Sequence, residues 1–64
     1  MNTRIEQLIE EIRAAQGPWF VARLSLRLKF RISGPDVVDT DENLRQLGEA
    51  CREMGYDPRR RAAP

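Results

Sequence analysis

The feature that most constrains this chain is residues 19–32, where apolar and polar side chains alternate. Every residue of one parity is apolar: Phe20, Ala22, Leu24, Leu26, Leu28, Phe30 and Ile32. At 180° per residue the apolar and polar sets of residues 20–32 separate onto two faces, with Val21 as the only apolar residue on the polar side. At 100° per residue the apolar set scatters around the axis. The segment holds no Gly, Pro, Asn or Asp to form a hairpin turn. The pattern therefore predicts one long β-strand with a dry face and a wet face.

A strand of this length needs a partner for its backbone hydrogen bonds. Residues 20–32 would span roughly 43 Å as a strand, whereas a 64-residue globule has a diameter of roughly 28 Å. The only other strand candidate, residues 36–38, follows a Ser-Gly-Pro-Asp turn signal and is too short to cover it. We therefore expect a symmetric homodimer whose long strands, residues 20–32, pair antiparallel about a two-fold axis.

Residues 3–16 are predicted to form an amphipathic helix. Its apolar residues recur at spacings of three and four, which places them on one face: Ile5, Leu8, Ile9, Ile12 and Ala15. Thr3 and Glu6 have the spacing of a capping box at its start. Gly17 and Pro18 are expected to end it, because glycine suits a left-handed cap and proline cannot continue the helix.

Residues 40–54 are predicted to form a second amphipathic helix, whose apolar stripe is Leu44, Leu47, Cys51 and Met54. Either Asp39 or Thr40 is placed to be its N-cap. Asp41 and Arg45 have the spacing of an i,i+4 ion pair. Gly55 is expected to end the helix, with the ring of Tyr56 folding back toward Cys51.

Together these elements predict an α+β fold in the order helix, long strand, helix. The antiparallel sheet is completed across the homodimer, with the helices on one face. We expect one small domain, residues 1–58, and a basic, solvated tail, residues 59–64. A core of this size gives only marginal stability. With one cysteine and no histidine, the chain points to neither an internal disulfide nor a metal site, so oligomerisation is the remaining way to stabilise the fold.

Charge is unevenly distributed, although the net charge is only +1. Residues 17–34 carry four cations and no acid, whereas residues 35–58 carry seven acids and two arginines. The four cations share the wet parity of the predicted strand: Arg23, Arg27, Lys29 and Arg31. This pattern indicates a binding face for an anionic partner, because arginine binds carboxylate and phosphate in bidentate fashion. The alternatives are that the arginines only solvate an exposed face, or that the acidic second helix neutralises them.

Few other residues suggest chemistry. Without histidine or a cysteine cluster, the composition points to no catalytic, cofactor or metal site. Cys51 lies on an apolar stripe, which favours a core role over a reactive thiol. The acids near the second helix, Asp36, Asp39, Asp41 and Glu42, fit helix capping and dipole effects better than a calcium loop. No apolar run reaches membrane-spanning length, and the chain starts with acidic residues, so we expect a cytoplasmic protein without membrane contact.

The expected function is that of a small, non-enzymatic protein-interaction module: an adaptor, an inhibitor or a regulatory subunit. Its partner would be an acidic protein surface, bound by Arg23, Arg27, Lys29 and Arg31. Trp19 would either join this contact or pack over the edge of the core, since tryptophan and arginine are enriched at binding centres. The alternative is a nucleic-acid-binding transcriptional regulator that inserts the paired strands into DNA as a β-ribbon.

Overall fold

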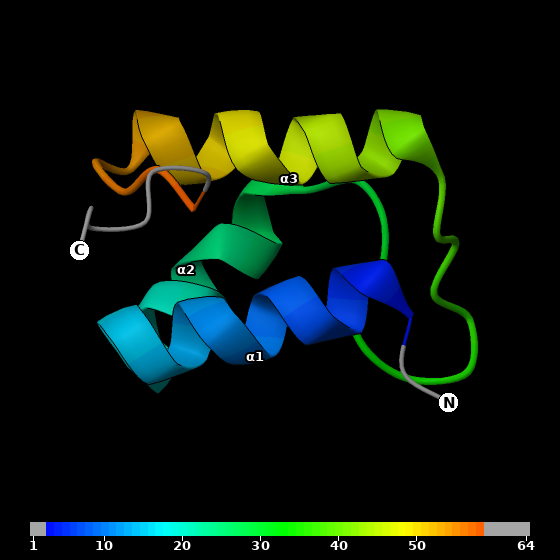
Figure 1. Ribbon diagram of the computed structural model, residues 1–64, viewed down its shortest axis with the longest axis horizontal. Helices are drawn as coiled ribbons and strands as arrows, with labels where there is room; N and C mark the ends of the chain where they lie inside the picture. Colours follow the sequence, from blue (N-terminus) through cyan, green and yellow to red (C-terminus); the bar gives the residue numbers. More distant parts are fainter. Residues whose placement is uncertain (1–2, 59–64) are drawn as a thin grey trace, which may run out of the picture.

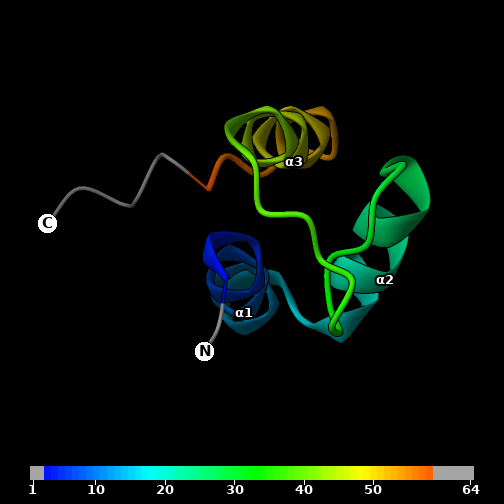
Figure 2. The same ribbon diagram turned by 90° about the vertical axis from the view of Figure 1, so that its right-hand side faces the viewer.

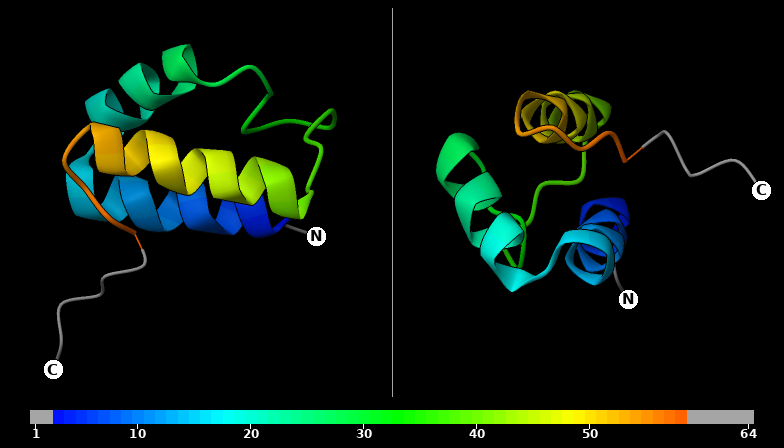
Figure 3. Two further views of the ribbon diagram at one scale, coloured as in Figure 1. Left: turned by 90° about the horizontal axis from the view of Figure 1, so that it is seen from above. Right: turned by 90° about the vertical axis from the view of Figure 1, so that its left-hand side faces the viewer.

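The computed structural model of the protein describes residues 3–58, which form three helices: α1 (Arg4–Gln16), α2 (Pro18–Arg27) and α3 (Asp41–Glu53) (Figure 1). Helices α1 and α3 run in the same direction, and α2 crosses beside them and packs against both (Figures 1 and 3). Seen almost along α1 and α3, the three helices lie around a common centre (Figure 2). The predicted basic tail, residues 59–64, lies outside the described residues.

The prediction of an α+β fold is wrong. Residues 20–32 form no strand: they are helical as far as Arg27 and irregular beyond it. Residues 36–38, the second strand candidate, form part of a turn and an irregular segment. Because residues 3–58 contain no strand, they have neither an antiparallel sheet nor an arginine-rich sheet face.

The backbone explains why this segment is helical. A lone strand leaves its N–H and C=O groups without partners, whereas a helix satisfies them within the segment. Leu, Arg and Ala, which favour helices, make up half of α2, and Val21 is its only β-branched residue. Pro18 occupies the first turn, where its fixed φ and missing N–H cost nothing. The helical subset Val21, Leu24 and Leu28 faces inward, with Val21 and Leu24 6% and 0% exposed.

Gly17 connects α1 to α2 without any further linker. Its φ of 90° lies in a region that side chains rarely adopt, and its N–H donates to the carbonyl of Arg13 at 2.8 Å. Gly17 is thus the C-cap of α1 and the N-cap of α2. The Gly-Pro pair, predicted only to end the first helix, also begins the next one.

Helix α1 confirms the prediction for residues 3–16. The Thr3 hydroxyl accepts from the N–H of Glu6 at 3.1 Å, and the Glu6 carboxylate accepts from the N–H of Thr3 at 3.2 Å. These two bonds form the expected capping box. Ile5, Ile9 and Ile12 are the buried residues of the apolar face.

Helix α3 confirms the prediction for residues 40–54, with Thr40 as the N-cap. At its end the N–H of Gly55 donates to Arg52 and the N–H of Tyr56 donates to Cys51, both at 3.0 Å. This pair of bonds, with Gly55 at φ 93°, is a Schellman motif. The Tyr56 ring meets Phe20 edge-on, with ring centroids 5.9 Å apart.

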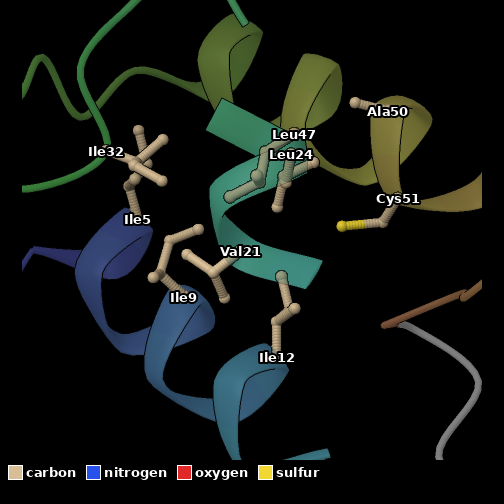
Figure 4. Packing of buried hydrophobic residues seen from close by; sticks show 9 residues of the cluster. All are labelled: Ile5, Ile9, Ile12, Val21, Leu24, Ile32, Leu47, Ala50 and Cys51. Atoms are coloured by element: carbon tan, nitrogen blue, oxygen red, sulfur yellow. The ribbon is translucent and has the colours of Figure 1, made fainter. Parts of the chain in front are cut away.

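The core lies between the three helices and is entirely apolar (Figure 4). Its buried members are Ile5, Ile9, Ile12, Val21, Leu24, Ile32, Leu47, Ala50 and Cys51. Ile32 reaches this core from the irregular segment, residues 28–40, which returns from the end of α2 to the start of α3. None of the helices in residues 3–58 is long and apolar enough to cross a membrane.

Candidate interaction site

The outward side of α2 gathers apolar and basic side chains. Trp19, Arg23 and Leu26 lie within about 60° of one another around the helix axis, since each residue advances the helix by about 100°. We use the name α2 outer face for the exposed residues on this side: Trp19, Ala22, Arg23, Leu26 and Arg27. Residues at these spacings are neighbours on a helix surface. The α2 outer face is therefore one continuous patch.

Two large apolar side chains of this patch are in solvent. Trp19 is 83% exposed and Leu26 is 87% exposed. Trp19 therefore does not cover the core, which was one of its two predicted roles. Since the opposite side of α2 is buried, the helix carries apolar residues on both sides. A helix with apolar residues on two sides is typical of one that is covered on both.

An open groove runs between α2 and the end of α3. It has a volume of about 570 Å³ and is lined by Phe20, Arg23, Leu26, Arg27 and Met54. Phe20 and Met54 are half-buried and pack against the core, so they form a floor that is part of the fold. Leu26 and the two arginines rise from α2 as its wall.

The positive charge of the groove is only partly neutralised by the acids of residues 3–58. Arg27 pairs with Glu53 of α3, with 3.8 Å between Nη1 and Oε1. Arg23 makes no ion pair within residues 3–58. A carboxylate approaching Arg23 therefore meets a guanidinium that no described acid already holds.

Three other acids of α3, Asp41, Glu42 and Glu49, form ion pairs away from the groove. Arg45 binds Glu42 and also Glu49, the latter at 2.6 Å, whereas the sequence predicted a pair with Asp41. The bond from Arg45 lowers the pKa of the Glu42 carboxyl. Asp41 instead accepts from Arg4 at 3.0 Å. Within residues 3–58, no group of three or more potential ligands is placed to hold a metal ion.

Cys51 is fully buried in the core, in agreement with its predicted packing role (Figure 4). Burial raises the pKa of its thiol to about 11. The thiolate is the nucleophilic form, and at neutral pH it is a very minor species with such a pKa.

The structure brings three of the five predicted site residues together: Trp19, Arg23 and Arg27 share α2. Lys29 and Arg31 are exposed in the irregular segment beyond it. Sequence reasoning missed Phe20, Leu26 and Met54, because it assigned them to buried faces. Val21 was the available signal of a helix. The predicted strand placed this apolar residue on its polar face, whereas a helix turns Val21 inward and Leu26 outward.

Comparisons with models of protein families, with curated proteins and with solved structures find no match to this chain. We therefore infer the function of this chain from the geometry of the α2 outer face.

Proposed function

We propose that this protein is a small, non-enzymatic interaction module, acting as an adaptor, an inhibitor or a regulatory subunit. It binds an acidic surface of a partner protein through the α2 outer face. The observation that carries this proposal is the arrangement of Trp19 and Leu26, both more than four-fifths exposed, on either side of Arg23. Tryptophan and arginine are enriched at the centres of protein interfaces, where apolar side chains surround them and exclude water.

Charge favours a different protein over a second copy of this chain. In a two-fold contact between two α2 outer faces, Arg23 of each copy would lie near Arg23 of the other. Like charges in an interface cost several kcal/mol. Arg23 of one copy is also poorly placed to bind the glutamates of α3 in another copy. Arg45 already binds Glu42 and Glu49, and Arg27 already binds Glu53.

The predicted homodimer through residues 20–32 also loses its main physical reason. Its basis was an unpaired strand, and the helical backbone of α2 is satisfied within the helix. The small size of the core still favours an additional contact, and an acidic partner protein would supply it.

Two observations support a non-enzymatic role. The lining of the groove consists of two arginines and three apolar residues, which provides no general base or nucleophile. The thiol of Cys51 is buried and, with a pKa of about 11, is protonated at neutral pH. A cytoplasmic location belongs to the same proposal, because a chain with a single cysteine forms no internal disulfide and suits a reducing compartment.

The test uses a photocrosslinking amino acid at Ala22, an exposed residue about midway along the α2 outer face. The same amino acid at Ala14, an exposed alanine of α1, is the matched control. We expect one protein to be crosslinked from position 22 and not from position 14 in the cells that make this chain. Equal crosslinking from both positions would contradict the proposal.

The crosslinked partner is then purified and titrated with the full chain. We expect Arg23→Glu to weaken binding by about tenfold or more, because it places a carboxylate against an acidic surface. Arg13→Glu, at an exposed position of α1, serves as the control and should change binding by less than about twofold. Unchanged affinity of Arg23→Glu would show that the α2 outer face does not bind an acidic surface.

Nucleic acid remains a second candidate partner, because Arg23, Arg27, Lys29 and Arg31 are all exposed and residues 17–34 contain no acid. Titration of labelled duplex and single-stranded nucleic acid at about 50 and 200 mM salt separates the two candidates. Phosphate binding would fall steeply with salt, with a slope near −0.9 per phosphate contact for duplex DNA. Tight, strongly salt-dependent binding would favour a transcriptional regulator, whereas absence of binding would remove that candidate.

A further inference from the structure

The groove between α2 and α3 indicates which kind of acidic element the partner presents. Resting on the function proposed above, we infer that the partner docks a single acidic amphipathic helix, with apolar side chains in the groove and carboxylates on the arginines. The dimensions, the wall and the charges of the groove all favour such a helix.

The groove is too large for one side chain. A cavity of about 150 Å³ holds a molecule of benzene, and this groove has several times that volume. The lining residues on α2 extend from Phe20 to Arg27, a rise of about 10 Å at 1.5 Å per residue. Two anchors seven residues apart on a partner helix are separated by the same rise. A helix lying along α2 therefore fills the groove with successive anchors at the i, i+3, i+4 and i+7 spacing.

Other peptide conformations fit the site less well. A bound strand needs a sheet edge to supply main-chain hydrogen bonds, and residues 3–58 contain no strand. A helix in a groove needs no backbone partners from the site, because its own hydrogen bonds are internal. The lining by Phe20, Leu26 and Met54 is the apolar surface that such a helix buries.

The floor of the groove is already built in the free protein. The Phe20 ring contacts the Tyr56 ring edge-on, with an angle of 82° between the two ring planes. Met54 is the C-cap of α3, and its N–H donates to Ala50 at 3.2 Å. A preformed site loses less conformational entropy on binding. The partner helix therefore meets a floor that already packs against the core, with Leu26 and the arginine side chains exposed beside it.

Charge sets where the acids of the partner helix lie. Arg27 is shared with Glu53, whose carboxylate repels an acid approaching that end of the groove. Arg23 is one helical turn earlier on α2 and has no acidic partner within residues 3–58. We therefore expect the main carboxylate contact at Arg23 and a weaker one at Arg27.

The test uses three synthetic, end-capped peptides of about 15 residues, since shorter helices are marginal in water. The first carries leucines at the i, i+3, i+4 and i+7 spacing and glutamates at the flanking positions. The second has the same composition, with the leucines scattered around the helix. The third has lysine in place of every glutamate. Emission of Trp19, the only tryptophan of the chain, reports binding to the full-length protein.

We expect the first peptide to bind saturably, and the scattered peptide to bind at least about tenfold more weakly, because it cannot place its leucines on one face. Leu26→Glu should weaken binding of the first peptide by a similar factor. Val38→Glu, at another exposed apolar side chain, should leave it unchanged. Circular dichroism confirms that both variants remain folded.

Each other outcome has a distinct meaning. Equal affinity for the first and scattered peptides would overturn the helix inference but leave an acid-binding face. Equal affinity for the lysine peptide would overturn both the inference and the proposed function. Absence of binding by any peptide at about 1 mM, a concentration that reveals even millimolar dissociation constants, would overturn the inference alone. Crosslinking at position 22 tests the proposed function independently of the peptides.

Discussion

Arg4 and Asp39, 35 residues apart in the chain, are joined by two hydrogen bonds. The backbone N–H of Arg4 donates to Oδ2 of Asp39 at 2.9 Å, and its Nε donates to Oδ1 at 3.2 Å. The Asp39 carboxylate thus lies at the N-terminus of α1, where the helix dipole favours negative charge. With Asp41, it also raises the pKa of the Arg4 guanidinium, Asp41 having the larger effect. This contact attaches the end of the irregular segment, residues 28–40, to the start of α1.

We expect Asp39→Ala to lower the midpoint of urea unfolding, because it removes both contacts with Arg4. Asp39→Asn should retain part of the stability, since an amide oxygen still accepts from the N–H of Arg4. Asp36→Ala, at an exposed acid of the same segment, is the control and should have no effect. If Asp39→Ala and Asp36→Ala unfolded at the same urea concentration, the contact with Arg4 would contribute nothing.

A comparison of Leu24 with Leu26 distinguishes the helix from the predicted strand. Both residues would lie on the dry face of a strand, but in α2 they are 0% and 87% exposed. We expect Leu24→Ala to lower the free energy of unfolding by about 2–5 kcal/mol, and Leu26→Ala to change it by less than about 0.5 kcal/mol. Chemical denaturation followed by circular dichroism measures both. Similar large losses would support the strand.

Two glycines of α3 and its cap should respond in opposite directions to alanine. Gly55 has a φ of 93°, which costs an alanine about 1–2 kcal/mol. Gly48 lies within the helix, and an added Cβ would meet only the end of the Arg52 side chain, at 3.5 Å. We therefore expect Gly55→Ala to destabilise the protein and Gly48→Ala to stabilise it by about 0.5–1 kcal/mol. Thermal unfolding of both variants provides the measurement, and a stabilising Gly55→Ala would rule out the Schellman geometry.

Alkaline pH should weaken the fold through Cys51. Burial raises the pKa of this thiol from 9.0 to about 11, so the folded protein holds the proton more tightly than the unfolded chain. The resulting stability is fully present below pH 9 and is lost as the pH rises toward about 11, which lowers the free energy of unfolding by about 1–3 kcal/mol. The decline should be smaller in Cys51→Ala. Parallel pH profiles for the two proteins would show that the thiol does not contribute.

The two flanking helices were predictable because their ends are encoded locally. Thr3 and Glu6 form the capping box that their spacing indicates, and Gly55 provides the left-handed residue that ends α3. The partners of Asp41 were not predictable in this way. Helical spacing pointed to Arg45, but Asp41 contacts Arg4, which only the tertiary fold brings near.

Residues 19–32 were predicted wrongly because their apolar side chains include one set that fits the strand period and another that fits the helix period. Alternation places Leu24 and Leu26 on one face, whereas the helical period groups Leu24 with Val21 and Leu28. Counting apolar residues favours the first pattern, since only Val21 violates it. Backbone hydrogen bonding decides for the second, because residues 3–58 offer no strand to pair with. The same error hid the α2 outer face, since it placed Leu26 in the core and Val21 in solvent.

The two sides of α2 are under different requirements. Val21 and Leu24 face the core, so a change in either affects whether the chain folds. Trp19, Ala22 and Leu26 face outward, so the fold tolerates many side chains there. The chemistry of this outer surface can therefore diverge while the scaffold is inherited intact. A library varied at these sites alone should yield folded members with different surfaces, which makes this short helix a starting point for engineered binders.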